Sequence, residues 1–222
     1  MNLQREKKGI NSIRPYLIAL HSSTNTLGIA ILDSRSPQAT LNSSIFPINR
    51  NLSNKIISCV EELLPSSKWP QLCRIAVSIG PGGFTSTRIT VVMARTLAQQ
   101  LDCNLDGISS FALMAPRLAN SLASSQKKKP FWIVKTLPRR GIIAGKYLIR
   151  KSSNTNDFEI GQELEGPRLI SSTFNLNPSI NTSDDVRSDV LQLIRISLIS
   201  EQENDQKCWK DVIPIYPTSP VD

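Results

Sequence analysis

The sequence has a single histidine, His21, among its 222 residues. A metal site built on a histidine pair needs two such side chains, and a hydrolytic triad needs a histidine beside a nucleophile and an acid. Hydroxyl residues follow at Ser22, Ser23 and Thr24, but no acid lies near them in the sequence. Such a run is typical of a turn, and a lone histidine at a strand end is typical of a structural residue. The local sequence therefore predicts neither a catalytic residue nor a metal site.

Cysteine pairs and long apolar runs are absent as well. The four cysteines are scattered without a CxxC pair, which argues against a zinc site or a disulfide framework. The apolar run at 16–20, behind a basic N-terminus, is shorter than a signal peptide needs, and no stretch approaches the roughly 20 apolar residues of a membrane span. We therefore expect a soluble, cytoplasmic protein with reduced thiols at Cys59, Cys73, Cys103 and Cys208.

Negative charge is missing from the middle of the chain. Residues 107–156, here called the basic belt, carry 10 Lys or Arg and no Asp or Glu, whereas residues 157–222 carry 12 acidic and 5 basic residues. With a formal net charge of +8, this distribution favours a polyanionic partner, because a basic surface neutralises phosphates. A short lysine run is also typical of a solvated loop, so both interpretations stand for the lysines alone. The candidate RNA-facing residues are Lys127, Lys128, Lys129, Arg139 and Arg140.

Hydrophobic patterning in the first half predicts an α/β unit. Aliphatic runs at 16–20 and 27–32 flank the polar stretch HSSTNT, and a weaker run follows at 40–48, which predicts a hairpin and a third strand. Helical spacing after Ser53 predicts a helix that ends at Pro65, and a fourth strand then leads into a glycine-rich loop and a second helix. This order of strands and helices is that of ribonuclease-H-like and actin-like folds.

The predicted second helix is apolar on two faces. One apolar stripe is enough to pack a helix on a sheet, so the small residues on the opposite side need another partner. The residues expected at this partner interface are Val91, Ala94 and Ala98, with Ile57 and Val60 of the first helix.

Patterns in the second half are weaker. Residues 111–122 predict a helix, residues 131–136 and 142–149 predict strands around a turn, and residues 186–198 predict an amphipathic helix. These elements indicate a shortened second unit of the same kind. The expected division is a basic extension over 1–15, a first actin-like lobe over 16–110, and a reduced second lobe over 111–222 with an acidic C-terminal part.

The sharpest motif is GPGGFTSTR, residues 80–88. A strand that runs into a glycine-rich loop and then a helix presents backbone N–H groups to an anion. The motif lacks the lysine of a P-loop, and its glycine spacing departs from GxGxxG. A phosphate contact and a tight turn that lets the helix pack close to the sheet both fit the loop.

Several stretches resemble the TsaB (YeaZ) family. SIGPGGFTSTRITVVMARTLAQQL is similar to that family's glycine-rich signature, GPGSFTGLRIG, and the helix after it. LIALHSSTNTLGIAIL resembles the family's opening hairpin, and LDGISSFALMA resembles its VSSLEALA segment. The likeness is strong over 16–115 and weak beyond, where it ends in PIYPTSPVD. The chain is identified on these motifs as a divergent member of the family.

The resemblance implies an actin-like ATPase fold and a non-catalytic scaffold or activator subunit, needed for threonylcarbamoyl transfer to the adenosine beside the anticodon of tRNA. The implied partners are a TsaD-like catalytic paralogue, a TsaE-like ATPase, and tRNA reached through the complex, with a homodimer left open and no membrane. It implies no cofactor of the chain's own and leaves open weak ATP or ADP binding at a subunit interface. The residues that would contact the nucleotide are Ser22, Ser23, Thr24, Gly80, Gly82 and Gly83.

Departures from the family pattern argue against an enzyme. His21 stands where the superfamily keeps an aspartate that helps to hold the metal of the nucleotide, and Mg²⁺ prefers oxygen ligands to imidazole. The catalytic relatives also carry a histidine pair for a metal, which one histidine cannot supply. The alternative is an autonomous enzyme, either an ATP-dependent member of the actin superfamily or an M22-type peptidase. A general RNA-binding protein would rest on the basic belt alone.

Overall fold

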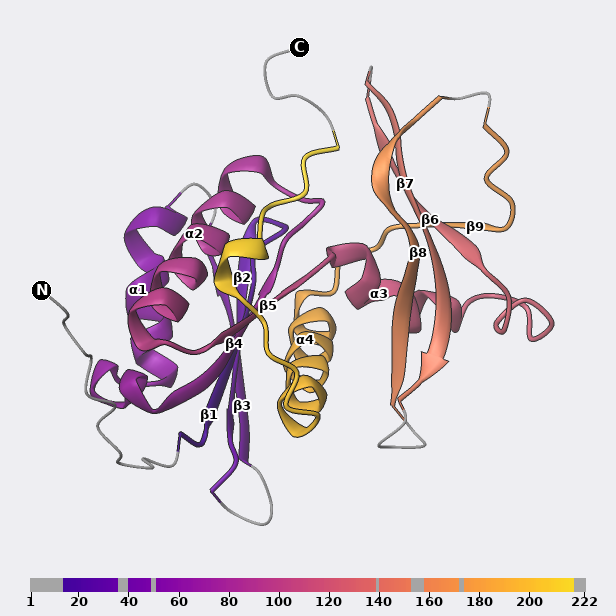
Figure 1. Cartoon of the computed structure of the whole chain (residues 1–222). Coiled ribbons are helices and arrows are strands. Elements are labelled where there is room, and N and C mark those ends of the chain that lie inside the picture. The colour runs from indigo at the N-terminus through magenta and orange to yellow at the C-terminus, as the bar shows by residue number, and fades with distance from the viewer. Residues whose placement is uncertain are drawn as a thin grey trace, which may run out of the picture.

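The computed structural model describes residues 14–35, 40–48, 51–138, 140–152, 158–171 and 174–217. These residues form two lobes, each built on one β-sheet (Figure 1). Of the predicted N-terminal extension, only Arg14 and Pro15 are described, and Arg14 Nη1 donates to the carbonyls of Leu101 and Asp102 at 2.8 and 3.1 Å. The described helices include none that is long and apolar enough to cross a membrane.

The first half folds as the predicted unit of three strands, a helix, a strand and a helix. Its elements are β1 (Tyr16–His21), β2 (Thr26–Asp33), β3 (Thr40–Pro47), α1 (Leu52–Leu63), the 3-10 helix η1 (Ser66–Gln71), β4 (Leu72–Ser78), α2 (Phe84–Leu101) and β5 (Asn104–Ile108). The strand order is β3-β2-β1-β4-β5, with the β1–β2 hairpin antiparallel and β4 parallel to β1. β5 was not predicted, and Ser53 lies inside α1 instead of before it.

The second half repeats part of this arrangement. Its elements are α3 (Ser110–Ala119), β6 (Phe131–Leu137), β7 (Gly141–Lys151), β8 (Glu159–Ile170), β9 (Ser179–Asn181), α4 (Val186–Gln202) and the 3-10 helix η2 (Trp209–Asp211). The sheet order β8-β7-β6-β9, with β9 parallel to β6, matches the order β3-β2-β1-β4 of the first lobe. No helix is present among the described residues between β8 and β9, where the first lobe has α1. The second lobe is therefore a shortened copy of the first.

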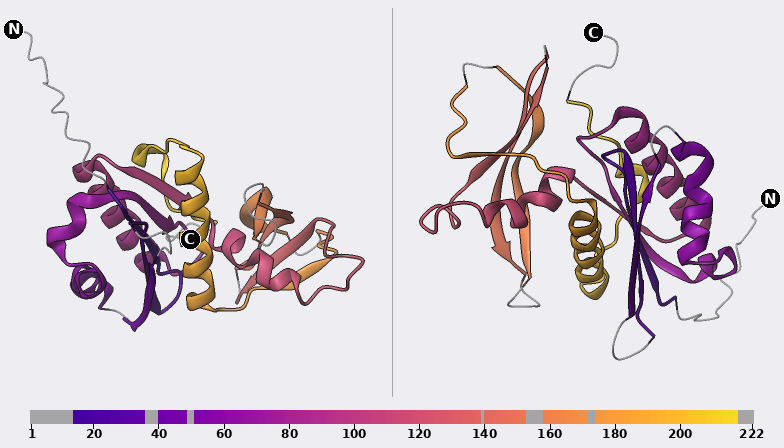
Figure 2. Two further views of the ribbon diagram at one scale, coloured as in Figure 1. Left: turned by 90° about the horizontal axis from the view of Figure 1, so that it is seen from below. Right: turned by 180° about the vertical axis from the view of Figure 1, so that it is seen from behind.

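The predicted lobe boundary at residue 110 does not follow the packing. α3 comes after the first sheet but packs on β7 and β8, whereas α4 comes after the second sheet but packs on β1, β2 and β4. Leu193 and Ile194 of α4 share a core with Leu17 and Ala19 of β1. Figure 1 and the rear view in Figure 2 both show α4 between the two sheets. The C-terminal part of the predicted second lobe thus belongs to the first lobe.

The small residues of α2 face the first sheet, which corrects the predicted partner interface. Four of the five residues expected there are at most 1% exposed: Val60, Val91, Ala94 and Ala98. They belong to the core between α1, α2 and the sheet, because small side chains let α2 approach the strands closely. The apolar side chains that these helices do expose are Ile57, at 44%, and Val92, at 56%.

A buried charge cluster ties α4 to the first sheet. Arg74 of β4 is fully buried and donates to Asp106 Oδ1 from Nη1 and to Glu201 Oε2 from Nε, each at 2.9 Å. Its guanidinium also donates to the carbonyl of Asp205. The second carboxylate oxygen of Asp106 accepts a hydrogen bond from Ser197 of α4 at 2.8 Å. Burial raises the pKa of Asp106, and the neighbouring guanidinium opposes that effect.

Replacing Arg74 by Met should destabilise the fold strongly, because it leaves Asp106 buried without its cation. We expect a loss of about 3–5 kcal/mol in the free energy of unfolding, measured with urea. The double variant Arg74→Met/Asp106→Leu should recover part of this loss, because no unpaired charge then remains inside. The Glu201 side chain is 37% exposed, so the control Glu201→Gln should cost about 1 kcal/mol or less. Equal stability of Arg74→Met and the wild type would contradict this account.

Candidate binding site between the lobes

The glycine-rich loop lies directly against the β1–β2 turn. Gly80 has a φ of 93°, a conformation that other residues rarely adopt. A Cβ at Gly82 would lie 2.4 Å from Ser23 Cβ, and Gly83 N donates to Ser23 O at 2.8 Å. The positive φ therefore accounts for the glycine at position 80, and the close contact between loop and turn accounts for Gly82.

The turn residues do not present free hydroxyls to a nucleotide. Ser22 Oγ lies 2.6 Å from Thr90 Oγ1 and donates to a carbonyl of α2 at 3.1 Å. Ser23 Oγ lies 3.1 Å from Ser78 Oγ, and Thr24 Oγ1 lies 2.9 Å from the threonine hydroxyl two residues on. The hydroxyls that the resemblance assigned to a nucleotide thus already bond within the chain, so the structure does not support that assignment.

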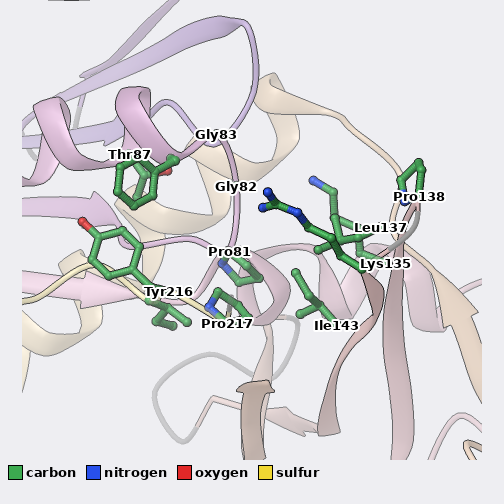
Figure 3. Close-up of a pocket in the computed structure, with 13 residues that line it drawn as sticks. Pro81, Gly82, Gly83, Thr87, Lys135, Leu137, Pro138, Ile143, Tyr216 and Pro217 are labelled. Carbon is green, nitrogen blue, oxygen red and sulfur yellow. The ribbon is translucent and has the colours of Figure 1, made fainter. Parts of the chain in front are cut away.

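A cavity of about 280 Å³ lies between the glycine-rich loop and the second lobe. Figure 3 shows Lys135, Leu137 and Pro138 of the β6–β7 hairpin across this cavity from the loop. The described residues that line it include the cations Lys135 and Arg140 and no Asp or Glu. The apolar part of the wall includes Pro81, Leu137, Pro138, Ile143 and Tyr216. The cavity therefore combines positive charge on one lobe with an apolar surface.

Thr87 lies in the first turn of α2 and lines the same cavity. Its side chain is 2% exposed, and among the described residues Thr87 Oγ1 has no hydrogen-bond partner. The positive end of the α2 dipole lies at this turn, because Thr87 N makes the first helical hydrogen bond, to Gly83 O at 3.0 Å. A buried hydroxyl without a partner lowers stability, so its presence calls for an explanation.

The C-terminal segment forms one wall of the cavity and is held by an aromatic cluster. Ile215 N donates to Ile79 O at 2.8 Å, next to the loop. The rings of Tyr216 and Phe84 have centroids 5.0 Å apart, and the Arg88 guanidinium lies 4.2 Å from the Phe84 ring centre. Arg88 Nε also donates to the Tyr216 hydroxyl at 3.2 Å. These contacts place Tyr216 beside the start of α2.

His21 lies in a buried polar network at the junction of the lobes. Its Nε2 is 3.8 Å from Asp189 Oδ2 of α4, and Asp189 accepts from Arg117 of α3 at 2.9 and 3.1 Å. Burial lowers the pKa of His21 to about 4, and the nearby Arg117 charge lowers it further. Burial raises the pKa of Asp189 to about 6, and Arg117 opposes this rise. No described hydroxyl lies within hydrogen-bond distance of the imidazole, whose Nδ1 accepts from Ser23 N at 3.4 Å. The histidine is therefore not arranged to activate a serine.

The basic belt divides into paired cations and cations at the surface. Arg117 and Lys146 make ion pairs with Asp189 and Glu165, and Arg150 donates to Gln162. The lysines at 127–129 lie in the connection between α3 and β6, and the described ion pairs include none of them. Arg140 lines the cavity, and Arg139 lies outside the described residues.

Sequence reasoning missed Lys135, Asp189 and the role of Thr87. Lys135 looked like one more belt residue, although its place beside the LPRRG turn sets it near the hairpin tip. Asp189, in the first turn of α4, is 2% exposed. The alternation of side chains along β1 could have signalled a buried polar contact of His21, because it places His21 on the same face as Leu17 and Ala19. That face is the one that α4 covers. Among the described residues no cluster of His, Cys, Asp or Glu could hold a metal ion.

Comparison with known proteins gives matches in sequence and in fold. The family model of TsaD, a tRNA N6-adenosine threonylcarbamoyltransferase, matches residues 46–137. The tRNA threonylcarbamoyladenosine biosynthesis protein TsaB of Bacillus subtilis is 36% identical over 101 residues, which are 45% of this chain and 43% of that protein. The TsaB of Buchnera aphidicola is 23% identical over 141 residues, 59% of this chain and 62% of that protein. These alignments thus span less than two thirds of either relative.

A solved structure of YeaZ from Pseudomonas aeruginosa superposes with a TM-score of 0.64 at 15% identity, covering 90% of this chain and 100% of that one. A second solved structure, of a protein described as similar to the peptidase YeaZ from P. aeruginosa, has the same TM-score, 16% identity, and coverage of 91% and 99%. This likeness shows the fold, which is the two-lobed actin-like fold that the sequence predicted. The sequence matches to TsaB and TsaD proteins each cover less than two thirds of this chain, which is similar to these proteins over that part.

The variant His21→Leu should alter the dependence of stability on pH. The pKa of His21 falls from 6.5 to about 4 on folding, so below pH 6.5 the unfolded chain binds a proton that the folded chain does not. This term destabilises the wild type increasingly as the pH falls from 6.5, and it levels off below about pH 4 at no more than about 3 kcal/mol. Asp189 titrates in the opposite sense, but it is present in both proteins.

The measurement is urea unfolding of both proteins at pH 7.5 and pH 4.5. The difference in the free energy of unfolding should move in favour of His21→Leu at the lower pH. A difference that stays constant between these pH values would mean that folding leaves the pKa of His21 unchanged.

Proposed function

We propose that the chain is a non-catalytic scaffold or activator subunit, needed for threonylcarbamoyl transfer to the adenosine beside the anticodon of tRNA. The names of the relatives support this role, since both curated relatives are tRNA threonylcarbamoyladenosine biosynthesis proteins. The main observation in favour of a non-catalytic role is that Gly82 and Gly83 of the glycine-rich motif contact Ser23. The motif therefore already makes contacts within the chain. The buried His21, without a nucleophile at its ring, supports the same conclusion.

The alternative of an autonomous peptidase has less support. The word peptidase belongs to the name of one solved neighbour, and the likeness of that protein to this chain is one of fold. The Ser22 hydroxyl bonds to Thr90 of α2, whereas the His21 ring turns toward Asp189 of α4. A serine and a base on opposite faces of the sheet do not make a nucleophile pair.

A TsaD-like catalytic subunit would dock on the outer face of α1 and α2. The two helices lie side by side on the first sheet (Figure 1). Ile57 of α1 and Val92 of α2 point to solvent, with exposed fractions of 44% and 56%. Exposed aliphatic side chains on paired helices suit a protein partner better than water. This face replaces the buried residues first predicted as the interface, and a homodimer would compete for it.

Replacing Val92 by Arg should abolish binding of the TsaD-like subunit and leave the fold intact. The new charge would lie in the centre of the proposed interface, where it would lack a partner. Binding is measured by co-purification and calorimetry, and folding by thermal denaturation. The matched control Leu164→Arg changes a residue that is 43% exposed on β8 of the second lobe and should bind normally. If Val92→Arg and Ile57→Arg both bind like the wild type, the interface lies elsewhere.

We further propose that tRNA and a TsaE-like ATPase join through this complex, which implies a cytoplasmic location. The lysine run 127–129 supports a contact with tRNA, because the described carboxylates do not neutralise it. The isolated chain should bind tRNA weakly, because a few mobile lysines lose side-chain entropy for each exposed contact. No cofactor of the chain's own is needed for this role.

Replacing Lys127, Lys128 and Lys129 together by Ala should reduce the salt dependence of tRNA binding by the assembled complex. Each lysine that neutralises a phosphate releases a condensed counterion, so the slope of log affinity against log salt should fall by up to about 2–3. The control triple Lys68→Ala/Arg187→Ala/Lys210→Ala removes equal charge outside the proposed docking face and should keep the slope. An equal slope in the wild type and the lysine variant would assign the run to a solvated loop.

A further inference from the structure

The face of the second sheet that points away from α3, here called the outer face, carries no described helix. α3 packs on the opposite face, where its core includes Phe131, Ile133 and Tyr147 of the sheet. Figure 1 and Figure 2 show α3 and α4 between the two sheets and no described helix on the far side of the second sheet. The first sheet, by contrast, has α1 and α2 on one face and α4 on the other.

Strand register places two cations of the basic belt and its neighbour β8 on the outer face. Lys146 pairs across the strands with Trp132, and Arg168 pairs with Ala144, and these two partners share a core away from α3. The Lys146 ammonium and the Arg168 guanidinium lie 3.9 and 3.1 Å from the carboxylate of Glu165. One acid therefore serves two cations, which leaves a net positive charge.

Arg150 adds a cation that no described carboxylate neutralises. It lies on the outer face, because its neighbour Ile149 packs in the core under α3 and side chains alternate along a strand. Its Nε donates to Gln162 Oε1, a neutral amide, at 2.9 Å. The lysine run 127–129 lies at the same end of the sheet, because β6 begins two residues after it and Phe131 pairs with Tyr147 of β7. Positive charge therefore extends from the run onto the sheet.

An exposed aromatic ring borders these cations. Phe174 is 48% exposed, and its ring centroid lies 5.7 Å from that of Trp132 at an interplanar angle of 78°. Lys146 Nζ lies 5.4 Å from the Trp132 ring centre, so the lysine and Phe174 cover the buried tryptophan together. The Phe174 ring is thus held in place and still meets solvent. Aromatic rings beside cations on a sheet surface suit the stacking of unpaired bases.

We propose that the outer face binds single-stranded RNA, with phosphates on Arg150, Arg168 and the lysine run and a base stacked on Phe174. A protein partner fits less well, because the aliphatic side chains of this face, Leu148 and Ile160, are already partly buried. The inference rests on the proposed contact with tRNA and names the part that fits, an unpaired loop. The bases of a stem are paired and cannot stack on a ring.

The test is binding of a labelled RNA hairpin with a seven-nucleotide loop to the full chain, by fluorescence anisotropy at low salt and by ¹⁵N NMR. The hairpin should shift the indole N–H of Trp132 and the amides of Lys146 and Arg150, and leave the amides of α1 and α2 in place. A fully paired RNA duplex of the same length should bind about fivefold more weakly or less. Equal binding of the two RNAs would overturn the stacked base.

Variants of Phe174 separate stacking from structure. Phe174→Leu keeps an apolar side chain on Trp132 but removes the ring, so affinity for the hairpin should fall about fivefold or more. Its Tm and the slope of log affinity against log salt should stay unchanged, because no charge is lost. Phe174→Tyr keeps the ring and should bind like the wild type. If Phe174 serves to cover Trp132 alone, Phe174→Leu will bind the hairpin normally, which overturns the stacking.

Charge variants test the phosphate contacts. Arg150→Gln/Arg168→Gln should lower the slope of log affinity against log salt by up to about 1.4, because each contact with a single strand contributes about 0.7. The control Lys68→Gln/Arg187→Gln removes equal charge from the first lobe and should keep the slope.

The proposal is overturned if Phe174→Leu and the arginine double variant both bind the hairpin like the wild type, or if the hairpin shifts no outer-face resonance. An effect of the lysine triple variant in the assembled complex would still support the tRNA contact, so the two failures are distinguishable. A TsaD-like subunit that shifts the outer-face resonances would assign this face to a protein contact and overturn the RNA site.

Discussion

The two lobes hold together because each supplies a helix to the sheet of the other. α3 follows the first sheet and covers the second, and α4 follows the second sheet and covers the first. The ion pair of Arg117 on α3 with Asp189 on α4 joins these exchanged helices where they meet. Neither sheet is complete without the chain segment that belongs, in sequence order, to the other half, so separate folding of residues 16–110 and 111–222 is not expected.

This exchange of helices also explains why the C-terminal end of β1 is buried on both faces. α4 is anchored at its start through Asp189 and at its end through Glu201, which meets the fully buried Arg74. Held at both ends, the helix covers the β1 face that carries His21. On the other face, the contact of Gly82 with Ser23 leaves no room for even one added carbon. The end of β1, which carries His21, therefore lies inside a packed polar network.

The first lobe could be predicted from the sequence because its signals are local. Aliphatic runs, the HSSTNT turn and helical spacing each depend on neighbouring residues, and β1, β2, β3, α1, β4 and α2 formed as predicted. The predicted interface failed because burial is a long-range property. Ala94 and Ala98 form an apolar face in isolation, and only the fold shows that this face meets the sheet. The sequence did not predict β8, because its charged and apolar residues alternate only weakly. The cavity could not be predicted either, because its lining includes both Lys135 and Thr87, which lie 48 positions apart in the sequence. No local pattern encodes that approach.

The fold separates the cations of the basic belt into those that make ion pairs and those that do not, although the belt looked uniform in the sequence. The acidic C-terminal part returns to the belt, so Asp189 and Glu165 neutralise Arg117 and Lys146. Arg117 pairs with a buried carboxylate, so its removal would change stability before it changed binding to a polyanion. Among the described belt lysines, those outside the described ion pairs are the run 127–129, Lys135 at the cavity, and Lys151 at the end of β7. An extended RNA backbone suits an exposed run, because its phosphates repeat along a line. The cavity is instead bounded by residues of both lobes, so it differs in shape from the lysine run.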